Sequence, residues 1–510
     1  MLAKTYGAAL QGIDATIVTI EANTTNFAGE MCIVGLPDNA VKESSKRIQS
    51  AININAYNFP RKSVVVNMSP ADIKKEGASW DLPIAIAVLA TTGQVRQEML
   101  SRYMLMGELS LDGTLQPIRG ALSIAIEAQK AGFKAIILPY DNTQEAAVVK
   151  DIAVYGADNL RDVVRILNQE AEPIPTIVDI DELFAAKQDD YMFDFADVRG
   201  QDNVKKAMEV AAAGGHNMLM VGPPGSGKSM MAKRMPGILP DLSFEESIEI
   251  TKIYSVAGLL RNKNALITKR PFRSPHHTIS NVAMVGGGRV PKPGEVSLSH
   301  NGILFLDELP EFARSVLEEL RQPLEDAEVT ISRVGGTMTY PASLMLVASM
   351  KPCPCGYHGY SQKCTCKESE IAKYMGRISG PLLDRIDVHI EAAAVDFNKM
   401  GSRAPSESSA DIKARVVKAH KIQQERYKNE GIYFNSQLSA SQINKYCALG
   451  DEETSLMKLA FDRLGLSGRA YHKILKLSRT IADLAGSEDI KKNHIAEALQ
   501  LRNLDRKRLL

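Results

Sequence analysis

A loop near the middle of the chain has the composition and residue order of a phosphate-binding loop. It fits the pattern G-x-x-x-x-G-K-[ST], and its residues are Gly222, Pro223, Pro224, Gly225, Ser226, Gly227, Lys228 and Ser229. Glycines let the backbone wrap around phosphate oxygens, so that N–H groups face the anion. Lys228 is expected to reach the β- and γ-phosphates of a nucleoside triphosphate, and the Ser229 hydroxyl to hold Mg²⁺. A glycine-rich turn without a ligand is the alternative, which the flanking apolar run 217–221 and helical run 229–234 disfavour.

Two adjacent carboxylates provide a second part of such a site. The apolar run 302–306 predicts a buried strand that ends at Asp307 and Glu308. Asp307 is suited to hold Mg²⁺ through its water shell, and Glu308 to orient and deprotonate an attacking water. Alone, the two acids fit a core strand with a solvated end equally well, but their place after a phosphate loop favours catalysis. A strand over 344–349 is expected to bring a polar side chain near the γ-phosphate.

Two arginines are candidates for neutralising charge on a transferred phosphoryl group. Arg385 stands between Asp384 and Asp387, and its guanidinium could act on the phosphoryl or form a local ion pair with either acid. Arg469 begins a C-terminal helical run and could close on the nucleotide as part of a lid. The alternative for Arg469 is an ordinary surface arginine.

Four cysteines in one short loop form a candidate metal site. Cys353, Cys355, Cys364 and Cys366 could bind one Zn²⁺ tetrahedrally, with His358 as a possible substitute ligand. The C-x-C spacing is tighter than the usual C-x₂₋₄-C, so free thiols in a loop remain the alternative. A bound zinc would stiffen the loop that follows the strand over 344–349.

Composition limits the classes of function. With 510 residues and about 150 residues per domain, three or four domains are expected. The formal net charge is +1, so a DNA partner would need a local basic surface. No apolar run approaches the length of a membrane-spanning helix, and the N-terminus lacks the apolar core of a signal peptide. Six cysteines without a signal indicate a reducing cytoplasm, which is the expected location.

Three basic stretches are candidates for that local surface, at 261–273, 413–428 and 506–508. Each stretch is more often a solvated face than a nucleic-acid site. The first precedes His276 and His277, which we interpret as positioning residues of a loop rather than metal ligands.

Changes in composition divide the chain into four segments of a multidomain α/β protein. Residues 1–167 mix β-rich and helical runs, and the acidic, proline-bearing residues 168–194 are interpreted as a linker. Alternating strands and helices over 195–400 surround the phosphate loop, as in a nucleotide-binding core. Residues 401–510 are helical and charged, which predicts a C-terminal helical lid.

Several motifs together resemble the magnesium-chelatase-like AAA+ ATPases of the ComM/YifB type. They are the run 273–278 (RSPHHT), the run 286–295 (GGGRVPKPGE), the strand ending at 307–308 and the run 380–387. The resemblance implies a Walker A motif at 222–229, a Walker B motif at 303–308, an arginine finger at Arg385 acting on a neighbouring subunit's ATP, and a sensor-2 arginine at Arg469. It therefore implies a ring, most simply a homo-hexamer. Lys351 stands where this family usually has the sensor-1 asparagine. Its ammonium could still contact the γ-phosphate, but it only donates hydrogen bonds and cannot position a water molecule as an amide does.

The N-terminal segment resembles the proteolytic domain of Lon, of ribosomal-S5-like α+β fold. Ser79 stands at the position of the Lon serine, but Leu122 stands where the catalytic lysine is expected, and leucine cannot act as a base. The segment is therefore interpreted as a non-proteolytic scaffold.

The resemblance implies a cytoplasmic, hexameric ATPase that uses ATP and Mg²⁺ to drive a DNA transaction, such as branch migration or helicase activity during integration of incoming DNA. An alternative is a chelatase motor that remodels a protein partner for Mg²⁺ insertion, against which the Lon-like segment argues. A Lon-like peptidase is a third hypothesis, disfavoured by Leu122.

Overall fold

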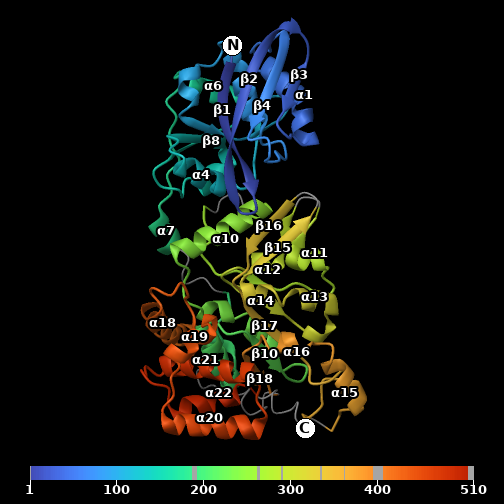
Figure 1. Ribbon diagram of the computed structural model, residues 1–510, viewed down its shortest axis with the longest axis vertical. Helices are drawn as coiled ribbons and strands as arrows, with labels where there is room; N and C mark the ends of the chain where they lie inside the picture. Colours follow the sequence, from blue (N-terminus) through green and yellow to red (C-terminus); the bar gives the residue numbers. More distant parts are fainter. Residues whose placement is uncertain are drawn as a thin grey trace. The chain divides into compact units, whose positions relative to one another are not determined.

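The computed structural model describes residues 2–185, 192–260, 265–288, 291–333, 336–360, 362–393 and 406–502. The chain forms two compact units (Figure 1). The first comprises Met1–Lys187 with Phe244–Thr268, and the second comprises Gln188–Ser243 with Lys269–Leu510. Within the described ranges, none of the helices combines the length and apolar character needed to span a bilayer.

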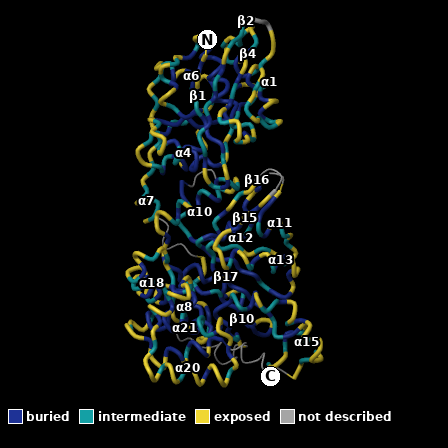
Figure 2. The backbone as a smooth tube through the Cα atoms, viewed as in Figure 1, coloured by how far each residue is buried: buried dark blue, intermediate teal, exposed yellow. Residues whose placement is uncertain are grey.

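A four-stranded sheet of order β1-β2-β4-β3 forms one layer of the first unit. Its strands are β1 (Leu2–Gln11), β2 (Asp14–Ala28), β3 (Met31–Val34) and β4 (Lys62–Ser69), of which only β3 and β4 pair in parallel. Alternation along β4 buries Val64, Val66 and Met68 on one face. Helix α2 (Asp81–Thr91) packs against β1 and β2 and is buried along its whole length. Figure 2 colours buried residues dark blue and exposed residues yellow.

A second sheet of the first unit, of order β5-β8-β9, is parallel. Its strands are β5 (Tyr103–Leu105), β8 (Ala135–Pro139) and β9 (Ala153–Ala157), and a small hairpin pairs β6 (Glu108–Leu109) with β7 (Leu115–Gln116). The helices are α1 (Asn39–Ile54), α3 (Gln97–Leu100), α4 (Ala121–Lys130), α5 (Thr143–Ala146), α6 (Leu160–Leu167) and α7 (Ile180–Ala185), with a 3₁₀ turn η1 (Tyr140–Asn142). Helix α7 thus lies inside the expected linker.

Helix α10 (Phe244–Ala257) joins the first unit although its sequence lies inside the expected nucleotide-binding segment. It contacts α4, and Ser255 Oγ donates to the buried carboxylate of Glu145 at 2.7 Å. The ammonium of Lys252 pairs with Asp14 at the start of β2. The chain therefore leaves the second unit after Ser243 and returns at Lys269.

The second unit is built on a five-stranded parallel sheet of order β11-β14-β17-β10-β18. Its strands are β10 (Met218–Val221), β11 (Phe272–Arg273), β14 (Ile303–Leu306), β17 (Met345–Met350) and β18 (Val388–Glu391). The three central strands are buried at every position, because the sheet is covered on both faces. Two hairpins lie outside this sheet, β12 (Gly286–Gly287) with β13 (Lys292–Pro293) and β15 (Glu328–Arg333) with β16 (Gly336–Pro341).

Helices from distant parts of the sequence complete the second unit. Those before β18 are α8 (Asp202–Gly214), α9 (Lys228–Ala232), α11 (Asn281–Val285), α12 (Glu295–Leu298), α13 (Arg314–Glu319), α14 (Pro323–Asp326), α15 (Glu368–Met375) and α16 (Gly380–Leu383), with 3₁₀ turns η2 (Phe195–Asp197), η3 (Met235–Ile238) and η4 (Leu309–Glu311). Those after it are α18 (Ser409–Arg426), α19 (Ala440–Tyr446), α20 (Asp451–Leu464), α21 (Gly468–Leu484) and α22 (Lys492–Gln500), with the turn η5 (Asn435–Gln437). Because α18 and α21 pack on α8 and share one hydrophobic core with the sheet, the C-terminal helices belong to the same unit as the phosphate loop.

Candidate active site

The phosphate loop connects β10 to α9 in the order that the sequence predicts. Gly225 and Gly227 have φ of +77° and +83°, a left-handed conformation that favours glycine. Gly222 has no room for a side chain, because a Cβ there would lie 2.1 Å from the carbonyl oxygen of Ala392. These constraints explain why the loop carries glycine at three of its positions.

Lys228 folds back into its own loop. Its ammonium donates to the carbonyl oxygens of Gly222 and Pro223 at 2.8 and 2.9 Å, and to Ser226 Oγ at 3.2 Å. Burial lowers the pKa of Lys228, and the nearby carboxylate of Asp307 opposes that shift. The ammonium is thus held where the loop backbone would meet phosphate oxygens.

Three strands bring polar side chains together at the carboxyl edge of the sheet. Asp307, directly after β14, accepts a hydrogen bond from Ser229 Oγ at 2.7 Å and another from Ser349 Oγ, in β17. A hydroxyl and a carboxylate are hard oxygen ligands of the kind that Mg²⁺ prefers, so Ser229 and Asp307 fit a magnesium ion. Ser349 thus places a hydroxyl of the strand beside Asp307; its contact with a γ-phosphate stays a prediction.

Glu308 lies beside Asp307 in an unusual backbone conformation. Its φ is +54°, and its N–H donates to Asp307 Oδ1 at 3.1 Å and to Ser349 Oγ at 3.4 Å. Its carboxylate Oε1 lies 2.6 Å from the ammonium of Lys351, which follows β17. The sequence pointed to Lys351 as a phosphate contact but not to this ion pair.

Arg385 and Arg469 lie on the opposite side of the same sheet, where the amino ends of its strands meet. Arg385 precedes β18, and β18 runs parallel to β10 with Val388 opposite Met218, so Arg385 is near the amino end of β10 and the phosphate loop is at its carboxyl end. The Arg385 guanidinium pairs with Glu325 and donates to the Arg321 carbonyl oxygen at 3.1 Å. Its ion-pair partner is therefore Glu325 rather than Asp384 or Asp387, which the sequence suggested.

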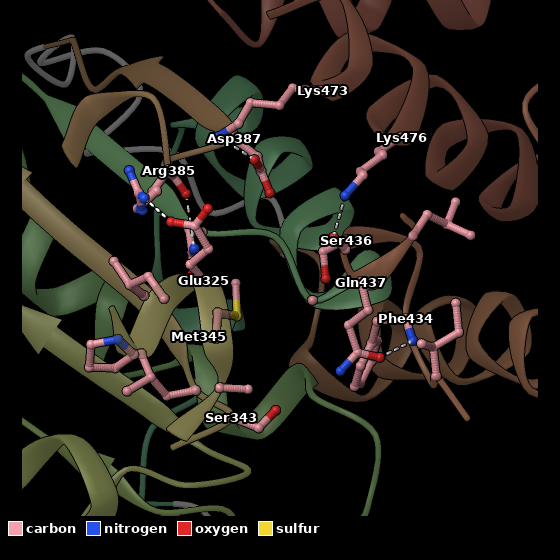
Figure 3. Close-up of a pocket in the computed structure, with 18 of the residues that line it drawn as sticks. Glu325, Ser343, Met345, Arg385, Asp387, Phe434, Ser436, Gln437, Lys473 and Lys476 are labelled. Carbon is pink, nitrogen blue, oxygen red and sulfur yellow. Dashed lines mark hydrogen bonds and ion pairs between the residues drawn. The ribbon is translucent and has the colours of Figure 1, made fainter. Parts of the chain in front are cut away.

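Both arginines line a cavity of about 720 Å³. Figure 3 shows Arg385 in this cavity, close to Glu325. Arg469 is largely exposed, and its guanidinium lies 3.7 Å from Asp384. Lys473 and Lys476, on the same helix α21, also line the cavity, and the residues of the phosphate loop do not. The structure therefore groups Arg469 with Arg385 rather than with the phosphate loop of its own chain.

Asp387 ties this edge of the sheet to helix α21. Its carboxylate forms an ion pair with Lys473 Nζ at 2.8 Å and lies 3.1 Å from His216 Nδ1, while His216 Nε2 is 2.8 Å from Thr480 Oγ1. Burial opposes ionisation of Asp387, but Lys473 and His216 together hold its pKa well below the usual range. The first turns of α21, with Arg469, are thereby fixed next to the start of β18.

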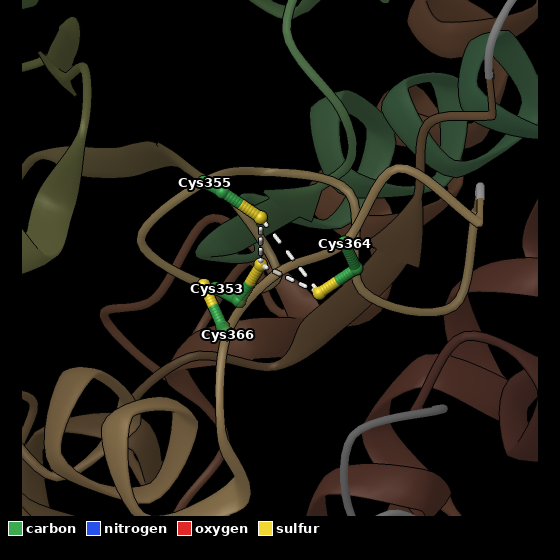
Figure 4. Close-up of side chains that lie close together, drawn as sticks. All are labelled: Cys353, Cys355, Cys364 and Cys366. Carbon is green, nitrogen blue, oxygen red and sulfur yellow. Dashed lines mark hydrogen bonds between the residues drawn. The ribbon is translucent and has the colours of Figure 1, made fainter.

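The four cysteines of the loop after β17 come together (Figure 4). Their sulfur atoms all lie within 4.8 Å of one another, and three of the separations are 3.4, 3.7 and 3.9 Å. Four sulfurs at about 2.3 Å from one zinc ion would be about 3.8 Å apart, so the set fits a tetrahedral Zn²⁺. The backbone N–H of His358 donates to Cys353 Sγ at 3.4 Å.

The basic stretches give less support to a DNA surface. Residues 261–264 and 506–508 lie outside the described residues. In α18, Lys413 pairs with Asp241 at 2.6 Å, Arg415 with Glu407 at 2.5 Å and Arg426 with Asp483 at 2.5 Å. These ion pairs neutralise much of the positive charge that the sequence places on that helix.

Comparisons with known proteins follow the same division of the chain. The family models "Subunit ChlI of Mg-chelatase", "Magnesium chelatase, subunit ChlI" and "Magnesium chelatase, subunit ChlI C-terminal" match residues 20–142, 194–400 and 406–502. Competence protein ComM of Haemophilus influenzae is 42% identical over 511 residues, which cover 99% of this chain and 98% of that protein. The protein YifB of Salmonella typhimurium is 41% identical over 508 residues, with 99% and 98% covered.

The N-terminal region has a separate likeness. A Lon protease of Clostridium beijerinckii is 24% identical over 168 residues, 31% of this chain and 21% of that protein. The expected fold class is confirmed: a Lon-like N-terminal region, an α/β core with a parallel sheet, and a helical C-terminal region. An AAA+ family of this kind indicates an ATPase that uses ATP and Mg²⁺. The chain belongs to the magnesium-chelatase-like AAA+ family that includes ComM and YifB.

Proposed function

We propose that this protein is a ring-forming motor that hydrolyses ATP in order to act on DNA. The observation that carries the proposal is the separation of two groups on one sheet. Lys228, Asp307 and Glu308 lie at its carboxyl edge, and Arg385 and Arg469 lie at its amino edge. A single chain cannot bring both groups to one nucleotide, whereas adjacent chains in a ring can.

Hydrolysis follows from the side chains at the carboxyl edge. The loop N–H groups and Lys228 bind the β- and γ-phosphates, and Glu308 orients a water molecule and takes its proton. The water oxygen bonds to the γ-phosphorus as the bond to the bridging oxygen breaks, which yields ADP and phosphate. Mg²⁺, held by Ser229 and Asp307, supplies neutralisation of phosphate charge when bound.

The arginines at the amino edge act on the nucleotide of the neighbouring chain. Arg385 would neutralise charge on the transferred phosphoryl, with Arg469 beside it as a second cation. Mixing two inactive proteins tests this arrangement. Glu308→Gln and Arg385→Ala variants should each be inactive, and their mixture should recover part of the activity, because some junctions then combine an intact Glu308 with an intact Arg385. A mixture that stays inactive while rings form would contradict action between chains.

The DNA substrate is the finer part of the proposal. It rests on the full-length similarity to Competence protein ComM and on the resemblance to ATPases that drive branch migration. We propose a cytoplasmic homo-hexamer that moves branched or single-stranded DNA. The direct test is ATP turnover with and without a branched duplex, together with unwinding of a forked duplex. If none of the DNA substrates changes the rate of ATP turnover, the alternative of a chelatase-type motor that acts on a protein is favoured.

We also propose that the four cysteines hold a structural Zn²⁺. Their loop lies against the phosphate loop, since a Cβ on Gly356 would be 2.7 Å from Pro224 Cδ. Protein purified without chelators should contain about one zinc per chain, and Cys364→Ser should lose most of it because three thiolates bind more weakly than four. Only trace zinc in the unsubstituted protein would reject the site.

A further inference from the structure

The ion pair between Lys351 and Glu308 connects the ends of two neighbouring strands. Strands β14 and β17 are parallel, with Leu306 opposite Ala348, and the two charged residues follow shortly after. The side chains are 30% and 43% exposed, and the separation is 2.6 Å. Because the pair is open to solvent, a ligand that enters the site can compete for either partner.

The backbone of Glu308 leaves its carboxylate to be directed by its partners. Its single backbone N–H donates to both Asp307 and Ser349, and these bonds together with its left-handed φ fix the main chain. Where the carboxylate points then depends on the side-chain torsions and on what binds its oxygens. In this structure Lys351 binds Oε1, which makes that oxygen less available to a water molecule.

Lys351 also lies close to the phosphate loop. A Cβ on Gly356 would be 3.5 Å from Lys351 Cδ and 2.7 Å from Pro224 Cδ, so the lysine stem and the loop flank the same glycine. Burial is the main cause of the lowered pKa of Lys228, and the positive charge of Lys351 contributes to it. Two ammonium groups therefore approach the place where a terminal phosphate would lie.

We propose that Lys351 is a positioning residue that exchanges partners, holding the Glu308 carboxylate when no triphosphate is bound and moving to the terminal phosphate of ATP. This inference rests on the proposed ATPase function. A terminal phosphate carries more negative charge than a carboxylate and offers more acceptor oxygens, so it competes well for the ammonium. ADP lacks that phosphate. Glu308 is consequently released to act on water only when a triphosphate occupies the site.

A double-mutant cycle in nucleotide affinity tests the exchange. The proteins are unsubstituted, Glu308→Gln, Lys351→Met and the double variant, and the probes are ADP and a non-hydrolysable ATP analogue. Glu308→Gln removes the partner that competes for Lys351, so it should tighten analogue binding by roughly tenfold. In the Lys351→Met background the same change should tighten it by about threefold or less, because only carboxylate–phosphate repulsion is then relieved. ADP affinity should change less than about twofold throughout.

Two further variants separate this role from a structural one. Lys351→Arg keeps the cation and should retain the preference for the ATP analogue over ADP, while Lys373→Met, at an exposed lysine of α15, should change nothing. Equal tightening by Glu308→Gln in both backgrounds would overturn the exchange even if the protein hydrolyses ATP. Failure of the unsubstituted protein to bind the analogue or hydrolyse ATP would instead overturn the proposed ATPase function, and this inference with it.

Discussion

Two loops of this chain each bury a lysine, and they differ in what surrounds it. In the first unit, Lys75 is fully buried and donates to the Pro70 carbonyl oxygen. In the second, Lys228 is also buried and donates to loop carbonyls. Burial lowers the pKa of both lysines. Burial and a perturbed pKa alone therefore do not distinguish a structural lysine from a phosphate-binding one.

The neighbours make the distinction. Lys228 shares its edge of the sheet with hydroxyls and carboxylates from three strands, among which Asp307 and Glu308 remain partly exposed. Near the other loop the polar groups satisfy one another: the buried Asp81 carboxylate accepts from Arg47 Nε and Nη2 at 2.9 and 3.1 Å. Leu122, at the position expected for a catalytic lysine, is fully buried in the core. The buried Asp81 carboxylate is thus already occupied by Arg47, whereas Asp307 and Glu308 remain accessible to a ligand beside the phosphate loop.

The same substitution in both loops is the strongest test of this difference. Lys228→Met should lower ATP turnover by at least about a hundredfold, because the cation that neutralises the β- and γ-phosphates is lost. Lys75→Met should leave turnover within about twofold, since it removes no group from the nucleotide site. Steady-state ATP hydrolysis measures both, with thermal unfolding as a check that each variant folds. A comparable loss of turnover in folded Lys75→Met protein would show that the first loop takes part in hydrolysis.

The buried pair of the first unit should appear in stability rather than in turnover. Arg47→Met leaves the Asp81 carboxylate without its cation, and losing one partner of a buried ion pair costs about 3 kcal/mol of unfolding free energy. Burial raises the pKa of Asp81 to about 6, although Arg47 opposes the shift. A native-state pKa above the unfolded value of about 3.9 means that this carboxyl stabilises the fold most below about pH 4 and loses that contribution as the pH rises through about 6.

Removal of Arg47 should raise that native-state pKa further, so the pH at which the contribution is lost also rises. The destabilisation by Arg47→Met should therefore be small near about pH 5, where the carboxyl is protonated in the variant, and largest above about pH 8. Denaturant unfolding at the two pH values measures it. The double variant with Asp81→Asn is the control, because it has no carboxyl to titrate. A cost that does not change with pH would mean that Asp81 stays ionised in both proteins.

Local sequence predicted the carboxyl edge of the sheet well. A phosphate loop depends on glycines and a lysine at fixed spacing, and the acids at 307–308 follow directly on an apolar strand. The four cysteines are close in sequence, so their approach in the structure was also predictable. In each case the residues that meet are separated by a short loop or lie at the carboxyl ends of parallel strands of one sheet.

Contacts that depend on tertiary structure were not predictable in the same way. Arg385 and Arg469 belong to different segments, and their common cavity depends on how α21 packs on the start of β18 through Asp387 and Lys473. The sequence also did not predict that α10 belongs to the first unit. A helix at this place fits equally well into the alternation of strands and helices expected for the nucleotide-binding core. A buried hydrogen bond between Ser255 and Glu145 links it to residues more than a hundred positions away, and no local pattern marks such a pair.

The smallest expected effect concerns the serines of the two loops. Ser79 contributes its carbonyl oxygen, which accepts from the Gly107 N–H at 2.9 Å, and Ser79→Ala keeps that carbonyl. The free energy of unfolding of this variant should differ from that of the unsubstituted protein by less than about 0.5 kcal/mol, as for surface substitutions.

Ser229→Ala is the matched control. It removes a hydroxyl bonded to Asp307 at 2.7 Å and should lower ATP turnover by roughly tenfold or more through weaker Mg²⁺ binding. Casein hydrolysis with and without ATP completes the pair. Proteolysis that disappears in Ser79→Ala would reveal a base other than residue 122 beside Ser79, and the two loops would then both be catalytic.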